Sequence, residues 1–135
     1  MKYEKGLIAG CFDVIHPGYI KMFQDAKKVC QHLIIALHSD PTIDRPEKNK
    51  PVQTIGERKF ILESIKYVDE IVTYDTEKDL YSLLNSLELN VRILGTDYKN
   101  KSFTGDDLNI PIHFHERDHE WSSTDLKTRI KNSLE

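Results

Sequence analysis

Short hydrophobic runs alternate along this chain with segments in which apolar residues recur every three or four positions. Residues 7–9 and 33–37 are uninterrupted apolar runs, a pattern typical of strands buried on both faces of a parallel sheet. Residues 110–114 alternate between apolar and polar side chains, so one face of that strand is expected to be less buried. Strands are therefore predicted at 7–9, 33–37, 70–74, 91–94 and 110–114.

Helix signals fill the gaps between these runs. Pro17 suits the first position of a helix, because its missing N–H would be unpaired there anyway. Thr54 and Glu57 have the spacing of a capping box. The proline-containing segment 40–53 and the polar segment 98–109 are predicted to be loops. Helices are predicted over 17–29, over 55–67 with Phe60, Ile61, Ile65 and Val68 inward, from Thr76 onward, and from a cap at Ser122 to about 132.

The order of these elements predicts the fold class. Strands that alternate with helices form an α/β, Rossmann-like fold, with a mostly parallel five-stranded sheet and helices on both faces. A length of 135 residues without internal repeats or linkers predicts a single domain, 1–135.

Composition narrows the classes of function. Hydrophobic residues make up 39% of the chain and charged residues 30%, as in a soluble globular protein. A net charge of −3 argues against nucleic-acid binding, and two cysteines are too few for a disulfide framework. The sequence has no apolar run of membrane-spanning length and no signal-peptide core, so a cytoplasmic location is expected.

The stretch from Gly10 to Tyr19 carries the strongest chemical signal. Gly10 ends the first predicted strand, and His16-Pro17-Gly18 opens the first helix. Unpaired N–H groups and the positive dipole end make a helix N-terminus a binding site for anions. Ligands of open α/β sheets also bind beyond the carboxyl ends of the strands. The sequence therefore predicts a phosphate site here, with an imidazole at its mouth.

Gly10-Cys11-Phe12-Asp13, followed by His16-Pro17-Gly18, resembles the G-x-F-D-x-x-H-x-G-H signature of the nucleotidyltransferase superfamily of cytidylyltransferases and their adenylyltransferase relatives. Tyr19 stands where that signature has its second histidine. Residues 57–70 are similar to the family's R-x-x-x-L-x-x-x-x-x-V-D-E segment. Residues 117–124 are similar to the R-T-x-G-[IV]-S-T-T signature of bacterial glycerol-phosphate cytidylyltransferases.

The resemblance implies roles for the matching positions. His16 would contact the α- and β-phosphates and stabilise charge as the bond to pyrophosphate breaks, while Lys48 would reach the triphosphate and Arg117 its β- and γ-phosphates. The implied catalytic residues are His16, Lys48 and Arg117. The implied nucleotide-binding residues are Gly10, Cys11, Phe12, His16, Tyr19, Gly95, Asp97, Arg117, Ser122, Ser123 and Thr124, and the acceptor-binding residues are Asp13, His38, Lys50 and Arg58.

The implied reaction is attack of an acceptor phosphate oxygen on the nucleotide α-phosphorus, with release of pyrophosphate. Such chemistry depends mainly on positioning and on neutralising charge. Residues 117–124 favour CTP and a glycerol-3-phosphate-like acceptor, whereas the Gly10 motif and Gly95-x-Asp97 are also similar to adenylyltransferases that use ATP on sugar phosphates. The family further implies Mg²⁺ with the triphosphate, Asp13 as a candidate outer ligand, and a homodimer.

Other interpretations stay open at this point. Tyr19 could mark a nucleotide-binding module that has lost its chemistry. His38 could be an exposed residue at a strand end, and Arg58 could cap its own helix. His113, His115 and His119 invite a metal site, because residues two apart share one face of a strand, but no further ligands are evident and no metal ligands are assigned.

Overall fold

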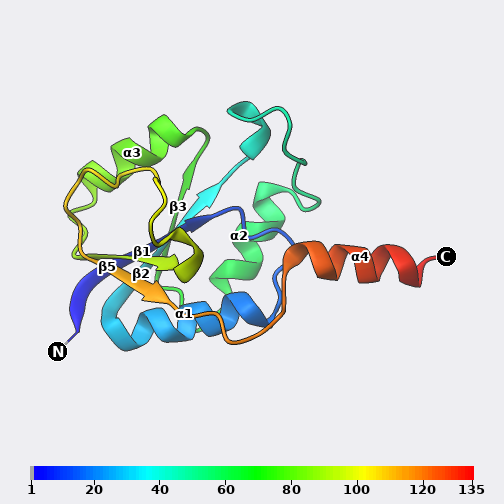
Figure 1. Ribbon diagram of the computed structural model, residues 1–135, viewed down its shortest axis with the longest axis horizontal. Helices are drawn as coiled ribbons and strands as arrows, with labels where there is room; N and C mark the ends of the chain where they lie inside the picture. Colours follow the sequence, from blue (N-terminus) through cyan, green and yellow to red (C-terminus); the bar gives the residue numbers. More distant parts are fainter. Residues whose placement is uncertain (1) are drawn as a thin grey trace.

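The computed structural model describes residues 2–135 and shows five parallel strands in one sheet with helices on both faces (Figure 1). The spatial order is β3-β2-β1-β4-β5, so strand order reverses between β1 and β4. This reversal is the point at which open α/β sheets bind ligands. The predicted fold class is confirmed. The strands are β1 (Tyr3–Gly10), β2 (Cys30–His38), β3 (Glu70–Tyr74), β4 (Val91–Gly95) and β5 (Ile112–His115).

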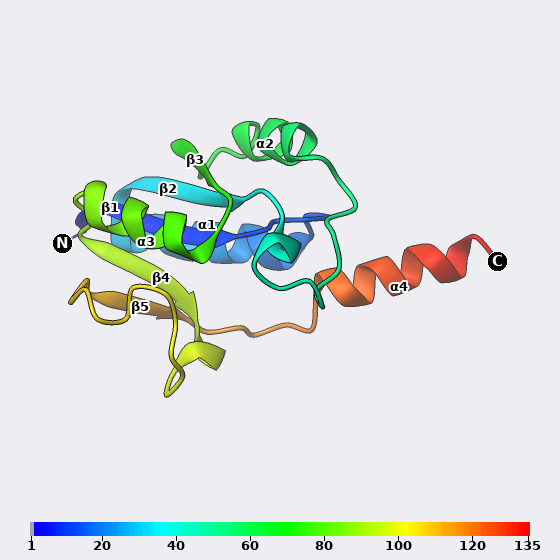
Figure 2. The same ribbon diagram turned by 90° about the horizontal axis from the view of Figure 1, so that it is seen from above.

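Helices cover the two faces unequally (Figure 2). One face is buried under α1 and α2 through Phe23, Ala26 and Leu62, and the other under α3 through Leu80 and Leu84. The helices are α1 (Pro17–Val29), α2 (Ile55–Glu63), α3 (Glu77–Ser86) and α4 (Ser123–Ser133), with single 3₁₀ turns at Pro41–Ile43 and Thr96–Tyr98. Within residues 2–135, no helix has the length and apolar character needed to cross a membrane.

The second helix is shorter than predicted. Its capping box at Thr54 is confirmed, but α2 ends at Glu63 rather than near residue 67. The inward placement of Phe60 was also wrong, because its side chain is 73% exposed. Arg58 and Leu62, four positions apart, occupy the buried face, and Phe60 between them faces solvent.

The last helix stands apart from the sheet. Figures 1 and 2 show α4 projecting beyond the other elements toward the C-terminus, and within the described chain none of its residues is buried. Its first turns contact the rest of the molecule. Ser123 and Lys127 contact the turn that follows β1, which places the N-terminus of α4 beside that of α1.

Candidate functional site

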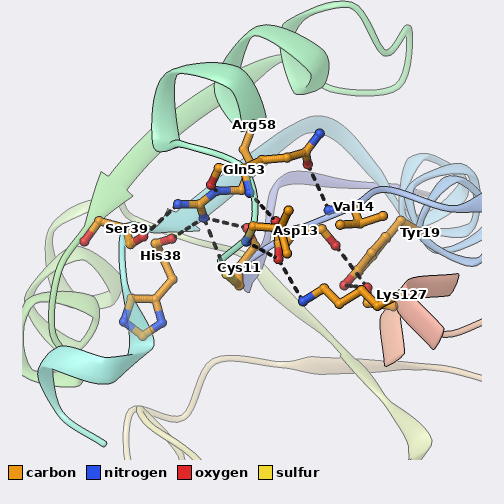
Figure 3. A network of polar contacts seen from close by, with 11 residues as sticks. Cys11, Asp13, Val14, Tyr19, His38, Ser39, Gln53, Arg58 and Lys127 are labelled. Carbon is orange, nitrogen blue, oxygen red and sulfur yellow. Dashed lines mark hydrogen bonds and ion pairs between the residues drawn. The ribbon is translucent and has the colours of Figure 1, made fainter. Parts of the chain in front are cut away.

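The turn between β1 and α1 is held in a strained conformation. Phe12 and Val14 have positive φ angles of 52° and 54°, which are unfavourable for residues with side chains. Asp13 lies between them and accepts hydrogen bonds from the backbone N–H groups of Val52, at 2.8 Å, and Gln53, at 3.0 Å (Figure 3). The Val14 N–H in turn donates to Gln53 Oε1 at 2.9 Å. The segment after the proline-containing loop therefore fixes the turn.

A lysine of α4 completes this arrangement. Lys127 Nζ lies 2.8 Å from Asp13 Oδ2 (Figure 3). Burial raises the pKa of Asp13, but hydrogen bonds from Lys127 and from the backbone N–H groups outweigh it, so the net pKa is lowered. Lys127 was missed at the sequence level. Its spacing of four residues from Ser123, which puts both on one helix face, is the signal that could have identified it.

Arg58 joins the carboxyl ends of β1 and β2. The residue is only 1% exposed, and each nitrogen of its guanidinium donates to a backbone carbonyl (Figure 3). The acceptors are Cys11 O at 2.8 Å, His38 O at 2.7 Å, Ser39 O at 2.7 Å and Gln53 O at 3.1 Å. The bonds observed here show Arg58 holding backbone segments together. Its predicted contact with the acceptor substrate stays a prediction.

His16 caps the N-terminus of α1. Its Nδ1 accepts the backbone N–H of Gly18 at 3.0 Å, so the neutral ring carries its proton on Nε2 and can donate from there. Burial lowers the pKa of His16, and the positive charges of His119 and Arg117 lower it further. The neutral, donating form is therefore favoured near pH 7.

A second imidazole lies over the same helix start. A Cβ at position 18 would be 2.5 Å from His119 Cε1 and 2.7 Å from His16 Cε1, so the two rings can meet there only over a glycine. The sequence suggests His119 only as a metal ligand. Its position three residues before the Ser122 cap is a weak signal, because a loop residue can point in many directions.

Tyr19 does not offer a free hydroxyl. Its O–H lies 3.0 Å from Ser123 Oγ, which itself donates to the carbonyl of Asp13 at 3.1 Å, so Tyr19 is the donor to Ser123. Its ring lies 4.3 Å from the His16 ring, measured between centroids. Burial raises the pKa of Tyr19 and keeps the hydroxyl neutral. Tyr19 thus connects α1, α4 and the β1 turn.

The other predicted phosphate ligands lie at the start of α4. Arg117 is exposed and donates to the carbonyls of His119, at 3.1 Å, and Trp121, at 2.5 Å. Ser122 is the N-cap and accepts the N–H of Asp125, and Thr124 is exposed in the first turn. The structure thus gathers His16, Tyr19, Arg117 and Ser123 around two adjoining helix N-termini.

A second group of predicted residues lines a cavity of about 920 Å³ at the carboxyl edge of the sheet. Members of the predicted set in its wall are Gly10, Cys11, His38, Lys48 and Gly95. The cavity extends between the start of α3 and the segment 98–106, where Arg92 lies in its wall. Lys50 is instead exposed, and its Nζ lies 3.9 Å from Asp40 Oδ2. Asp97 is exposed, and its Oδ1 would lie 2.5 Å from a Cβ at Gly95.

The three histidines of the metal interpretation do not converge. His113 and His115 on β5 both contact Asp25 of α1, at 3.2 Å and 2.7 Å, whereas His119 lies over Gly18. Throughout the chain from residue 2 onward, no group of three or more histidine, cysteine, aspartate or glutamate side chains is placed to hold a metal ion. Asp25 accounts for the placement of the two strand histidines.

Comparisons with curated proteins find relatives along nearly the whole chain. The chain is 30% identical over 125 residues to the "Bifunctional protein HldE" of Helicobacter pylori (strain HPAG1), covering 92% of this chain and 27% of that protein. It is 31% identical over 124 residues to the protein of the same name from Campylobacter jejuni, covering 91% and 27%. The chain therefore spans about a quarter of the length of these relatives.

Solved structures share the fold at lower identity. A lipopolysaccharide core biosynthesis protein from Thermoplasma volcanium matches with a TM-score of 0.61 at 18% identity, covering 97% of this chain and 88% of that one. A pantoate-beta-alanine ligase from Francisella tularensis matches with a TM-score of 0.60 at 18% identity, covering 96% and 69%.

The family comparison agrees with the motifs of the β1 turn and the α4 start. The family described as "Cytidylyltransferase-like" matches residues 7–129, a span that runs from the first buried strand to the middle of α4. Both helix N-termini and the cavity lie within it. The chain therefore belongs to the cytidylyltransferase-like family.

Proposed function

We propose that this chain transfers a nucleotidyl group from a nucleoside triphosphate, CTP in the first place, to a small phosphorylated acceptor and releases pyrophosphate. The observation that carries the proposal is the position of the His16-capped helix next to a cavity of about 920 Å³ at the topological switch point. Helix N-termini attract phosphate, and the neighbouring cavity offers room for a second substrate.

The chemistry follows from the donors on the two sides of the β1 turn. An acceptor phosphate oxygen forms a bond to the α-phosphorus while the bond to the pyrophosphate oxygen breaks. His16 Nε2–H and the N–H groups at the two helix starts would stabilise the charge that develops on the phosphates. Lys48, in the cavity wall, would neutralise the acceptor phosphate or the triphosphate.

Mg²⁺ would enter bound to the triphosphate rather than be held beforehand by side chains of the protein. The carboxylate expected to approach it, Asp13, already accepts two backbone N–H groups and the Lys127 ammonium. Oδ2 accepts the Val52 N–H and the Lys127 ammonium, and Oδ1 accepts the Gln53 N–H, so Asp13 already holds the turn and no step of the proposed mechanism runs through it.

Pyrophosphate release tests the proposal. CTP, ATP, UTP and GTP are each combined with glycerol 3-phosphate and a panel of sugar phosphates, with Mg²⁺ present. His16→Ala should lower the rate by about 10²- to 10³-fold, the loss typical of one transition-state donor. His32→Ala removes an imidazole that pairs with Glu70 away from the cavity and should leave the rate unchanged. Preference for CTP would support the family signature, and preference for ATP the alternative.

A nucleotide-binding module without turnover is the second candidate, and the Tyr19–Ser123 hydrogen bond favours it. That bond occupies a hydroxyl where the family signature has a histidine. Under the transferase proposal, Tyr19→His restores a charge-assisted donor and speeds transfer by up to about 10²-fold. If CTP binds but neither the natural chain nor Tyr19→His releases pyrophosphate with any acceptor, the binding module is correct. The homodimer and the cytoplasmic location stay predictions.

A further inference from the structure

Arg92 is a buried cation that no carboxylate of residues 2–135 contacts directly, although the charges of Glu77 and Asp106 act on it from a greater distance. It is the second residue of β4, is 5% exposed, and lines the cavity. Its Nη1 donates to the carbonyl of Thr104, but Nε is buried and has no hydrogen-bond partner among residues 2–135. No carboxylate in that part of the chain forms an ion pair with it. Buried charges are normally paired, so this guanidinium has unused capacity for an anion.

The backbone of Arg92 lies below the rim of the cavity. In the sheet register this residue is opposite Leu7, three residues before Gly10, so its backbone lies about 10 Å below the carboxyl edge. Gly10, Cys11 and Lys48 mark the rim, beside the start of α1. An acceptor whose phosphate reacts at the rim would therefore extend its other end toward Arg92.

The groups around Arg92 fit a polar end of a ligand. The centroid of the Phe103 ring lies 5.3 Å from the guanidinium carbon. Glu77 also lines the cavity, and its Oε2 is buried and, over residues 2–135, has no hydrogen-bond partner, although its Oε1 lies 3.4 Å from Arg45 Nη2. Arg92 and Glu77, each with one buried and unpartnered side-chain atom, thus line the same cavity. Asp106, Tyr74 and Tyr98 also lie in its wall.

From this geometry we infer that the acceptor carries a second oxyanion, a carboxylate or a phosphate, at the end remote from the reacting phosphate, and that Arg92 binds it. Arg92 is then a specificity-determining residue. A hydroxyl group next to that oxyanion can donate to the carboxylate of Glu77, which lines the same cavity. The inference rests on the proposed function in taking the cavity as the acceptor's site.

A structural role for Arg92 makes a different prediction. If the guanidinium only holds the segment 98–106 through Thr104 and Phe103, removing it changes stability but not the preference for one ligand over another. If it binds a second oxyanion, removing it abolishes that preference. Selectivity between matched ligands therefore separates the two roles.

NMR of the arginine side chains provides the test. The Nε–Hε signal of Arg92 is assigned by its loss in Arg92→Lys. The chain is then titrated with 3-phosphoglycerate against glycerol 3-phosphate, and with glucose 1,6-bisphosphate against glucose 1-phosphate. The first member of each pair adds a carboxylate or a phosphate, respectively. We expect the member of each pair with two anionic groups to shift the signal. It should bind about 10- to 100-fold more tightly than its partner, the effect of one charge-assisted hydrogen bond.

Two variants decide the outcome. Arg92→Met should remove the preference for the doubly anionic member, while Arg129→Met, which removes an exposed arginine of α4, should keep it. Thermal unfolding confirms that both are folded. The inference is overturned if no probe shifts the Arg92 signal, if both members of each pair bind equally, or if the preference survives in Arg92→Met.

These measurements do not require turnover, so the inference and the proposed function can fail separately. Selective binding without pyrophosphate release would contradict only the proposed transferase activity. Pyrophosphate release without selectivity at Arg92 would contradict only the proposal that the acceptor carries a second oxyanion.

Discussion

Two buried arginines differ in what they contact: Arg58, which joins the carboxyl ends of β1 and β2, and Arg92, which lies deeper in β4. Arg58 is 1% exposed and Arg92 5% exposed, so both guanidinium groups are removed from water to a similar extent. Every nitrogen of Arg58 donates to a backbone carbonyl. Arg92 donates to one carbonyl through Nη1, and its Nε has no partner anywhere in residues 2–135.

The polar groups around the two arginines differ in the same way: those near Arg58 have partners, whereas some near Arg92 have none among residues 2–135. Near Arg58, Asp13 is bound by Lys127 and two backbone N–H groups, and Tyr19 is bound to Ser123 (Figure 3). This saturated network fixes the turn and has little left to offer a ligand. The cavity wall around Arg92 keeps free polar atoms instead. Burial alone therefore does not separate a structural arginine from a binding one, whereas the count of satisfied donors does.

The largest effect is expected from Arg58→Met. The change removes the donors to the buried His38 carbonyl and to the part-buried carbonyls of Cys11 and Ser39, and should lower the free energy of unfolding by about 3 to 5 kcal/mol. Urea denaturation measures it, with the exposed Arg129→Met expected within about 0.5 kcal/mol of the natural chain. A loss for Arg58→Met no larger than that of the control would remove the distinction between the two regions.

Hydrophobic pattern and capping signals predicted the fold class because they are local. Apolar runs and, for β5, an alternating pattern located the strand cores, and the cap signals at Thr54 and Thr76 gave two helix starts. The end of α2 was missed because helical spacing continues through Ile65 although the backbone already turns at Ser64. The backbone N–H groups of Ser64 and Ile65 bond back to Ile61 and Leu62, so the last turn tightens where the spacing alone would continue the helix.

The site was predictable only where the motifs place it. His16, Gly18 and Ser123 follow from the strand–turn–helix order and the cap signals. The roles of Arg58 and Arg92 do not, because an arginine on a helix or in a strand gives no sign of how many carbonyls will face it. Lys127 and His119 approach the site from the α4 region, and that long-range contact leaves no local pattern.

A smaller effect is expected from Asp13→Asn. At pH 7 the variant loses the charge that binds Lys127 and two N–H groups, and should be less stable by about 1.5 to 3 kcal/mol. Because the folded pKa of Asp13 lies below its unfolded value, near 4, its contribution is complete above that value and is lost as pH falls through the folded pKa. The gap between the two chains should therefore narrow from about pH 4 downward.

Urea denaturation of both chains from pH 7 to pH 3 checks this dependence. Glu47→Gln removes an exposed carboxylate in the neighbouring loop and should show a small, pH-independent difference. A gap that stays constant on acidification, or that widens, would contradict ionic binding of Asp13.

Tyr19→Phe should have a modest effect on the saturated region. The variant keeps the ring against His16 but removes the donor to Ser123, whose oxygen still bonds the Asp13 carbonyl. The expected loss is about 1 kcal/mol in the free energy of unfolding. Tyr3→Phe, at the exposed start of β1, is the matched control. Equal stability of the two variants would mean that the hydroxyl is free for a ligand after all.

The smallest change in stability is expected from Arg92→Met in the ligand-free chain. Methionine removes the hydrogen bond to Thr104 and the contact with the Phe103 ring, which favour the natural residue. It also removes the cost of burying a cation that no carboxylate of residues 2–135 contacts directly, and replacement of buried charge by an apolar side chain of similar size is often neutral or stabilising. These contributions oppose each other, so the free energy of unfolding should change by less than about 1 kcal/mol in either direction. Urea denaturation beside Arg58→Met measures the contrast. A loss as large as that of Arg58→Met would show that Arg92, too, serves the fold and not a ligand.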